Sequence, residues 1–233
     1  MLALLVVTGI DARTFVLSTG VSNYNGNANN LKHTTQDTKR FADLMRSQTN
    51  DISILTGSNA NGNTILTKLH NIGMAAQPGD RIIFFFSGHG APGGIAVYDG
   101  LLPYGELIKV LADSKATEKI FFIDACHAGT VNEAEGSTEW THAVSKASNM
   151  AFVVSSRPEE ISKENGLLGA GAFTQSLLKG LRGKADLDNN KQITLLELFK
   201  YIHGDVMKHT KDKQHPMLIA PQKMHDSVIY VWK

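Results

Sequence analysis

A histidine and a cysteine each follow an apolar run of the chain. The run at residues 81–86, RIIFFF, leads into His89, and the run at residues 119–123, KIFFI, leads into Cys126, the only cysteine in the sequence. A thiol acts as a nucleophile when a nearby base or cation populates its thiolate, and an imidazole can do this and later protonate a leaving amine. The pattern therefore predicts covalent catalysis with Cys126 as nucleophile and His89 as acid and base.

The glycines beside His89 fit the same chemistry. Gly88 and Gly90 let the backbone approach a substrate closely, and the backbone N–H groups of Gly90 and Cys126 are predicted to hold a developing oxyanion. Taken singly, a cysteine after a strand is more often a small buried apolar residue. His127 is a second candidate base, but side chains adjacent in an extended chain point to opposite faces, so we prefer His89.

These residues must be positioned by the elements around them. Short apolar runs alternate with stretches of helical spacing, a pattern typical of parallel strands covered by helices on both faces. We therefore predict an α/β three-layer sandwich with a mostly parallel six-stranded sheet. Ligands bind at the carboxyl ends of such strands, where neighbouring strands would bring His89 and Cys126 together. The expected strands lie at residues 15–21, 52–55, 81–86, 119–123, 151–154 and 228–232, and the expected helices at 35–47, 63–76, 104–112, 173–181 and 195–207.

Length, charge and cysteine content exclude several classes of protein. The 233 residues carry 23 basic and 22 acidic side chains, so a polybasic nucleic-acid or membrane-surface binder is not expected. No apolar run approaches the roughly 18 to 20 residues of a membrane span. A lone cysteine excludes an intrachain disulfide and a cysteine zinc cluster.

The first residues leave two possibilities open. Residues 1–12, MLALLVVTGIDA, fit either a secretory signal that lacks its basic start or a further strand or extension. Residues 13–233 are predicted to form one domain. We expect this domain to be secreted or periplasmic if the signal is real, and cytoplasmic otherwise.

Around His89 and Cys126 the sequence resembles the caspase-like cysteine peptidases, the superfamily of caspases, metacaspases and bacterial relatives. The resemblance rests on SGHG at residues 87–90 and DACHAG at residues 124–129, and it continues in LKHTTQDTKRFA at 31–42 and AFTQSL at 172–177. It implies a caspase–haemoglobinase fold after Arg13 and a cysteine endopeptidase. The dyad would be His89 and Cys126, with oxyanion donors at Gly90 and Cys126 and no required cofactor.

Differences from animal caspases predict the substrate. Those enzymes carry Gln two residues before the nucleophile, where this chain has Asp124, as metacaspase-type enzymes do. Asp37 and, in a looser alignment, Glu164 fall in the regions where caspases place the arginines of their aspartate pocket. An anionic pocket favours Arg or Lys and repels Asp, so cleavage after Arg or Lys is expected. The alternatives are a turn-stabilising carboxylate for Asp124 and helix capping for Asp37.

A self-processing site follows from the same specificity. Relatives are often cut after the nucleophile, and Lys146 is the only Lys or Arg from His127 through Met150. Lys146 is therefore the predicted site. We expect peptide or protein substrates with basic residues, no nucleic-acid partner and a monomer.

The segment at residues 186–197, DLDNNKQITLLE, has the register of an EF-hand calcium loop. Position 6 is Lys191, where the sharp turn ordinarily needs glycine. The segment is either a structural calcium site or a capped helix–turn–helix connection that holds no metal. The ligand positions of a calcium site would be Asp186, Asp188, Asn190, Gln192, Thr194 and Glu197.

Two other functions are compatible with the fold. A catalytically silent caspase-like module would serve protein–protein interaction, although it would need neither reactive group. A different thiol hydrolase would act on small amides or thioesters, although the acidic candidates favour a basic peptide.

Overall fold

A six-stranded sheet forms the centre of the protein, and the computed structural model describes residues 12–24, 30–125, 149–157 and 171–232. The strand order is β10-β8-β7-β3-β1-β2, and every pair is parallel except β10 with β8. The predicted mostly parallel six-stranded sheet is therefore confirmed. Its strands are β1 (Thr14–Gly20), β2 (Ile52–Thr56), β3 (Arg81–Ser87), β7 (Glu118–Asp124), β8 (Met150–Val154) and β10 (Met217–Ile219).

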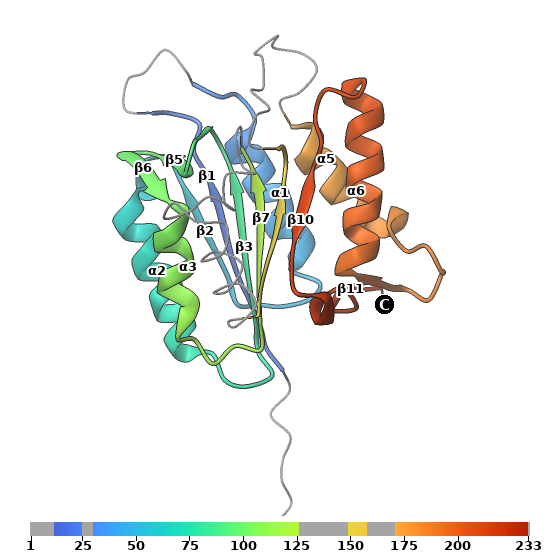
Figure 1. Cartoon of the computed structure of the whole chain (residues 1–233). Coiled ribbons are helices and arrows are strands. Elements are labelled where there is room, and N and C mark those ends of the chain that lie inside the picture. Colours follow the sequence, from blue (N-terminus) through green and yellow to red (C-terminus); the bar gives the residue numbers. More distant parts are fainter. Residues whose placement is uncertain (1–11, 25–29, 126–148, 158–170, 233) are drawn as a thin grey trace, which may run out of the picture.

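Helices cover both faces of this sheet (Figure 1). On one face lie α2 (Gly62–Ala75) and α3 (Tyr104–Ala112), and on the other lie α1 (Thr34–Met45), α5 (Ala172–Lys179) and α6 (Leu195–Thr210). These layers form the predicted three-layer sandwich. Short helical turns cover residues Gly57–Asn59, Gly180–Lys184 and Gln222–Met224.

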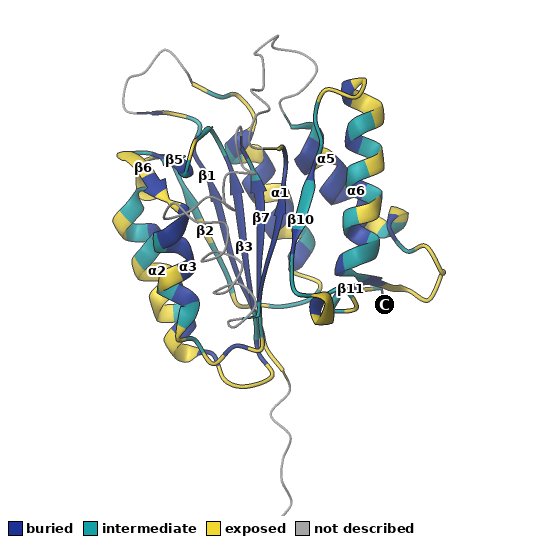
Figure 2. Cartoon of the chain, in the orientation of Figure 1, coloured by how far each residue is buried: buried dark blue, intermediate teal, exposed yellow. Residues whose placement is uncertain are grey.

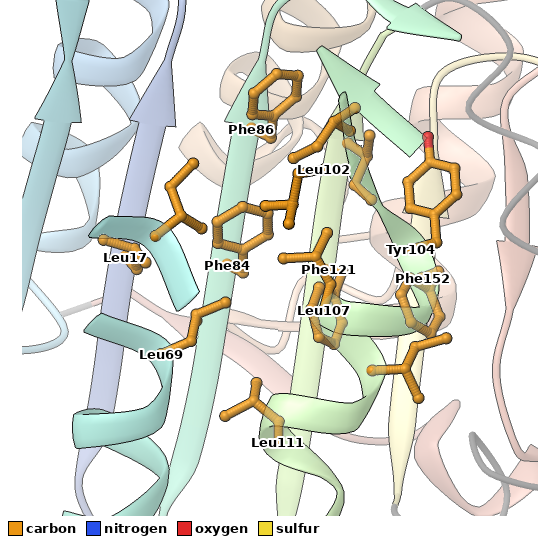
Figure 3. Close-up of a cluster of buried hydrophobic side chains, with 14 of the residues drawn as sticks. Leu17, Leu69, Phe84, Phe86, Leu102, Tyr104, Leu107, Leu111, Phe121 and Phe152 are labelled. Atoms are coloured by element: carbon orange, nitrogen blue, oxygen red, sulfur yellow. The ribbon is translucent and has the colours of Figure 1, made fainter. Parts of the chain in front are cut away.

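The central strands β3 and β7 are buried on both faces because their residues are apolar almost without interruption (Figure 2). Phe84 and Phe121 belong to the apolar cluster on the α2–α3 side, which Leu107 of α3 joins (Figure 3). Phe85 belongs to the opposite cluster and stacks on Phe41 of α1, with ring centroids 4.5 Å apart. Each such buried side chain contributes about 1.5 to 3 kcal/mol. The strands therefore give the loops at their carboxyl ends a rigid base.

Two small sheets lie outside the main one. β4 (Gly90–Ala91), β5 (Gly94–Val97) and β6 (Gly100–Pro103) form an antiparallel unit directly after His89. β9 (Gln192–Thr194) pairs antiparallel with β11 (Val228–Val231).

The sixth strand of the main sheet is not the one expected. The strand predicted at residues 228–232 forms as β11, but it pairs with β9 and does not join the main sheet. The edge position belongs to β10, whose Ile219 lies opposite Phe152 of β8. A strand of only three residues leaves no periodic pattern in the sequence, which is why β10 was missed.

The start of the described chain is anchored at Arg13. Its backbone N–H and its guanidinium bind the Asp80 carboxylate over 2.8 Å and 3.1 Å. Residues 1–11 lie outside the described part, so the signal or extension stays a prediction. Within the part of the chain that the structure describes, no helix has the length and apolarity needed to cross a membrane.

Candidate active site

The ends of β3 and β7 lie side by side, as the predicted dyad requires. Ser87 and Asp124, the last residues of the two strands, are register partners. The Gly88 N–H donates to the Asp124 carbonyl over 3.1 Å, which continues the pairing beyond the strand ends. His89 follows Gly88 directly. Cys126 lies outside the described residues, so its distance to His89 and its oxyanion role stay predictions.

Tyr24, from the segment after β1, holds the backbone of His89. Its hydroxyl accepts the His89 N–H at 2.6 Å, and the two ring centroids are 4.9 Å apart. The same hydroxyl helps explain Gly88, because a Cβ there would lie 2.9 Å from it and 2.6 Å from Cζ of Phe86. The contact joins residues 65 positions apart, so no local sequence pattern pointed to Tyr24.

The strand unit after His89 holds the other side of this segment. The His89 carbonyl accepts the Ala96 N–H at 2.9 Å, and Gly90 begins β4 opposite Ile95. The backbone around His89 is thus held from β7, from Tyr24 and from β5. The oxyanion role of Gly90 stays a prediction, because it depends on the position of Cys126.

Two of the three predicted specificity carboxylates come together; we call Asp37 and Asp124 the carboxylate pair. Asp37 lies in the first turn of α1 and is 4% exposed. Burial and the neighbouring Asp124 carboxylate raise the pKa of Asp37 to about 6, although Arg40, at 3.8 Å, opposes this. Desolvation also raises the pKa of Asp124. Asp37 is buried and Asp124 is partly exposed, and an acidic pair of this kind favours a cation beside it.

Thr174, at the start of α5, binds Asp124. Its Oγ1 and its backbone N–H donate to Asp124 Oδ2 at 2.6 Å and 3.2 Å, and both bonds oppose the effect of burial on the Asp124 pKa. Gly171, which caps α5 with a φ of +86°, lies near Asp37: a Cβ there would be 3.9 Å from Asp37 Oδ2. The elements α1, β7 and α5 therefore meet at the carboxylate pair. No local sequence pattern indicates a role for Thr174, because its partner is 50 residues away in the chain.

Ser155, directly after β8, fixes the residue that precedes Cys126. Its hydroxyl accepts the Ala125 N–H at 3.1 Å and donates to the Ala125 carbonyl at 2.8 Å. Ser155 is 2% exposed. This double contact ties the end of β7 to the end of β8 immediately before the predicted nucleophile.

The remaining peptidase predictions lie outside the described residues. This applies to Glu164, to the self-processing candidate Lys146 and to the second candidate base His127. All three stay predictions.

The loop at residues 186–197 brings three predicted ligands together. One carboxylate oxygen from each of Asp186, Asp188 and Glu197 lies within 4.8 Å of the others. Lys191 adopts a φ of +65°, so the backbone makes the turn of position 6 without glycine. In charge and ligand type the three residues fit calcium, which prefers carboxylate oxygens.

Hydrogen bonds give the same loop an explanation without metal. Asp186 accepts the Lys191 N–H at 3.0 Å, and Glu197 accepts the Leu187 N–H at 3.3 Å. Thr194 and Glu197 form a capping box at the start of α6. Calcium therefore stays a prediction, as do the ligand roles of Asn190 and Gln192.

The chain is similar to a known family in sequence and to a known structure in fold. The sequence matches the family described as Caspase domain over residues 13–224. The fold is similar to that of protein GSU0716 from Geobacter sulfurreducens, with a TM-score of 0.67, 17% sequence identity, and coverage of 95% of this chain and 100% of that chain. At this identity the similarity concerns the fold alone. No curated protein matches the sequence significantly.

Proposed function

This chain belongs to the caspase domain family, and on that basis we propose that it is a cysteine endopeptidase that cleaves after Arg or Lys. Membership of the family supports a cysteine-peptidase type of function. The observation that carries the specificity is the carboxylate pair, in which Asp37 is buried within the electrostatic reach of Asp124. Asp124 precedes the predicted nucleophile by two residues.

In the proposed reaction, the Cys126 thiolate attacks the carbonyl carbon of the scissile bond. The backbone N–H groups of Gly90 and Cys126 bind the oxyanion. Protonated His89 gives its proton to the amine as the C–N bond breaks. Water, losing a proton to His89, then hydrolyses the thioester, which restores the thiolate and the imidazolium.

The substrate side chain would bind at the carboxylate pair. A guanidinium or ammonium group stabilises the charged forms of both acids, whereas an aspartate would add a third negative charge. Glu164 is proposed as a further acidic group of the pocket. Lys146, which carries the preferred kind of side chain, is proposed as the site of self-processing.

Fluorogenic peptides test this proposal. The panel carries Arg, Lys, Asp or Asn before the leaving group, and Cys126→Ala serves as the inactive control. We expect turnover of the Arg and Lys peptides only, and none with Cys126→Ala. Absence of turnover for all four peptides, with Cys126 also unreactive toward alkylating agents at neutral pH, would instead favour a silent interaction module.

Self-processing has its own test. Mass spectrometry of active protein should show a new amino terminus at Ala147. An intact chain with full activity would show that cleavage after Lys146 is dispensable or absent.

A further inference from the structure

We propose that Thr174 is a positioning residue, whose hydroxyl orients the Asp124 carboxylate and favours its charged form for a basic substrate side chain. The part that concerns substrate rests on the proposed function. The part that concerns the charge and orientation of Asp124 does not.

Both donors of Thr174 reach the same oxygen of Asp124. The hydroxyl lies 2.6 Å and the backbone N–H 3.2 Å from Oδ2. Within the described residues, the hydrogen bonds to this carboxylate all end on Oδ2. Thr174 thus holds Asp124 by Oδ2, which sets the orientation of the carboxylate.

The hydroxyl acts on a carboxylate whose charged form is disfavoured by its surroundings. Burial opposes ionisation of Asp124, and Asp37 lies close enough for the two charges to interact. Hydrogen bonds donated to the charged form of an acid favour that form, and they are the cause that opposes burial here. A neutral Asp124 would offer a substrate cation no charge, so the hydroxyl contact bears directly on specificity.

The helix that carries Thr174 is itself fixed. Phe173 and Leu177 of α5 are fully buried in the apolar cluster between the sheet, α1 and α6. Thr174 is also 0% exposed. Its hydroxyl therefore occupies a set position beside Asp124, and the amino end of α5 adds a favourable dipole for the negative charge.

Thr174→Val tests the inference because it removes the hydroxyl and keeps both the shape and the backbone N–H. Thr174→Ser is the rescue variant. Thr49→Val is the matched control: the Thr49 hydroxyl also donates over 2.6 Å, but to the Thr14 carbonyl at the amino end of β1. Thermal unfolding checks that all three variants are folded.

Two readouts separate positioning from a merely structural role. The first is carbon NMR of labelled aspartate side chains, with the Asp124 signal assigned by Asp124→Asn. Thr174→Val should raise the pH at the midpoint of the Asp124 titration by roughly one unit. The second is the kinetics of Arg peptides, where KM should rise about tenfold with little change in kcat or in Cys126 alkylation. Thr174→Ser should restore both values, and Thr49→Val should alter neither.

The outcomes distinguish this inference from the proposed function. An unchanged Asp124 titration in Thr174→Val overturns the inference, whether or not the wild type cleaves peptides. A raised titration supports the role of Thr174 even if no basic peptide is cleaved, in which case the proposed function alone is rejected. If the midpoint rises but the KM for Arg peptides is unchanged, the claim that Thr174 contributes to substrate binding is overturned.

Discussion

Asp37 of α1 and Asp124 of β7 lie close enough that the charge of Asp124 helps to raise the pKa of Asp37 to about 6. The larger cause is burial, since Asp37 is 4% exposed. A helix and a strand thus each direct an acidic group to one place, and Asp124 comes two residues before the predicted nucleophile in the sequence. Holding the two acidic groups close together costs free energy of folding, and we expect binding of a basic side chain to offset this cost.

Replacing Asp124 should separate substrate recognition from thiol chemistry. We expect Asp124→Ala to lower kcat/KM for Arg and Lys peptides by about 100-fold or more, because the proposed charge partner of the substrate is lost. Alkylation of Cys126 should change far less, since the thiolate depends on His89. Parallel measurement of both rates checks this. Equal losses in the two rates would remove Asp124 from the substrate pocket.

Asp37 should reduce stability at neutral pH. Its pKa is raised from 3.8 to about 6 in the folded protein, so between these pH values the folded state holds a proton that the unfolded state has lost. Stability therefore falls as the pH rises from about 4 to about 6. Asp37→Asn avoids this cost, and we expect it to add about 1 to 2 kcal/mol to the free energy of unfolding at pH 7, after allowance for solvent screening.

Urea unfolding at pH 7 and pH 4 measures this effect. Most of the gain should disappear at the lower pH, because Asp37 is then protonated in the folded protein and partly protonated in the unfolded chain. Asp43→Asn, on the exposed side of the same helix, is the matched control and should change little at either pH. A destabilised Asp37→Asn at pH 7 would show that the charge of Asp37 is satisfied within the free protein.

The KM for basic peptides should depend on pH near the Asp37 titration. Asp37 interacts with Arg40 on its own helix, with His33 at the N-cap and with Asp124 on β7. These charges and burial together place its pKa at about 6. Below this pH one negative charge is lost, so KM for an Arg peptide should fall as the pH rises from 5 to 7. Asp37→Asn should abolish that fall. A KM that changes equally in both proteins would assign the titration to another group.

Calcium should stabilise the loop at residues 186–197 if that loop is a metal site. Calcium in the millimolar range would then raise the unfolding temperature of the wild type. Glu197→Gln should lose the response, because Gln can keep the capping box of α6 but not the charge. Asp212→Asn, an exposed carboxylate outside the loop, should respond as the wild type does. If calcium does not change the unfolding temperature of the wild type, the loop is a hydrogen-bonded connection that holds no metal.

Most strands of the main sheet could be predicted because each one appears in the sequence as a short apolar run. Uninterrupted apolar runs predicted β3 and β7 as strands buried on both faces, and their burial confirms this. The register of Ser87 with Asp124 adds that the two strands are neighbours. A local pattern does not state which strand another one pairs with, however. For this reason β11 was expected in the main sheet, and β10 was missed altogether.

The site was predictable where residue type alone carries the chemistry. The positions of His89 and Asp124 follow from strand ends, and Asp37 followed from the resemblance in the first helix. Tyr24 and Thr174 could not be found in this way, because their contacts with His89 and Asp124 span 65 and 50 residues. A tyrosine in a loop and a threonine near a helix start are ordinary residues until the fold supplies their partners.

The central claim is that His89 activates Cys126, and the alkylation rate of the chain's only thiol tests it most directly. The measurement is the rate of iodoacetamide modification of the wild type and of His89→Ala between pH 5 and 10. We expect the wild type to react well below the pH of about 8.5 at which an ordinary cysteine ionises, and His89→Ala to react only near that value. Superimposable pH profiles for the two proteins would contradict the account.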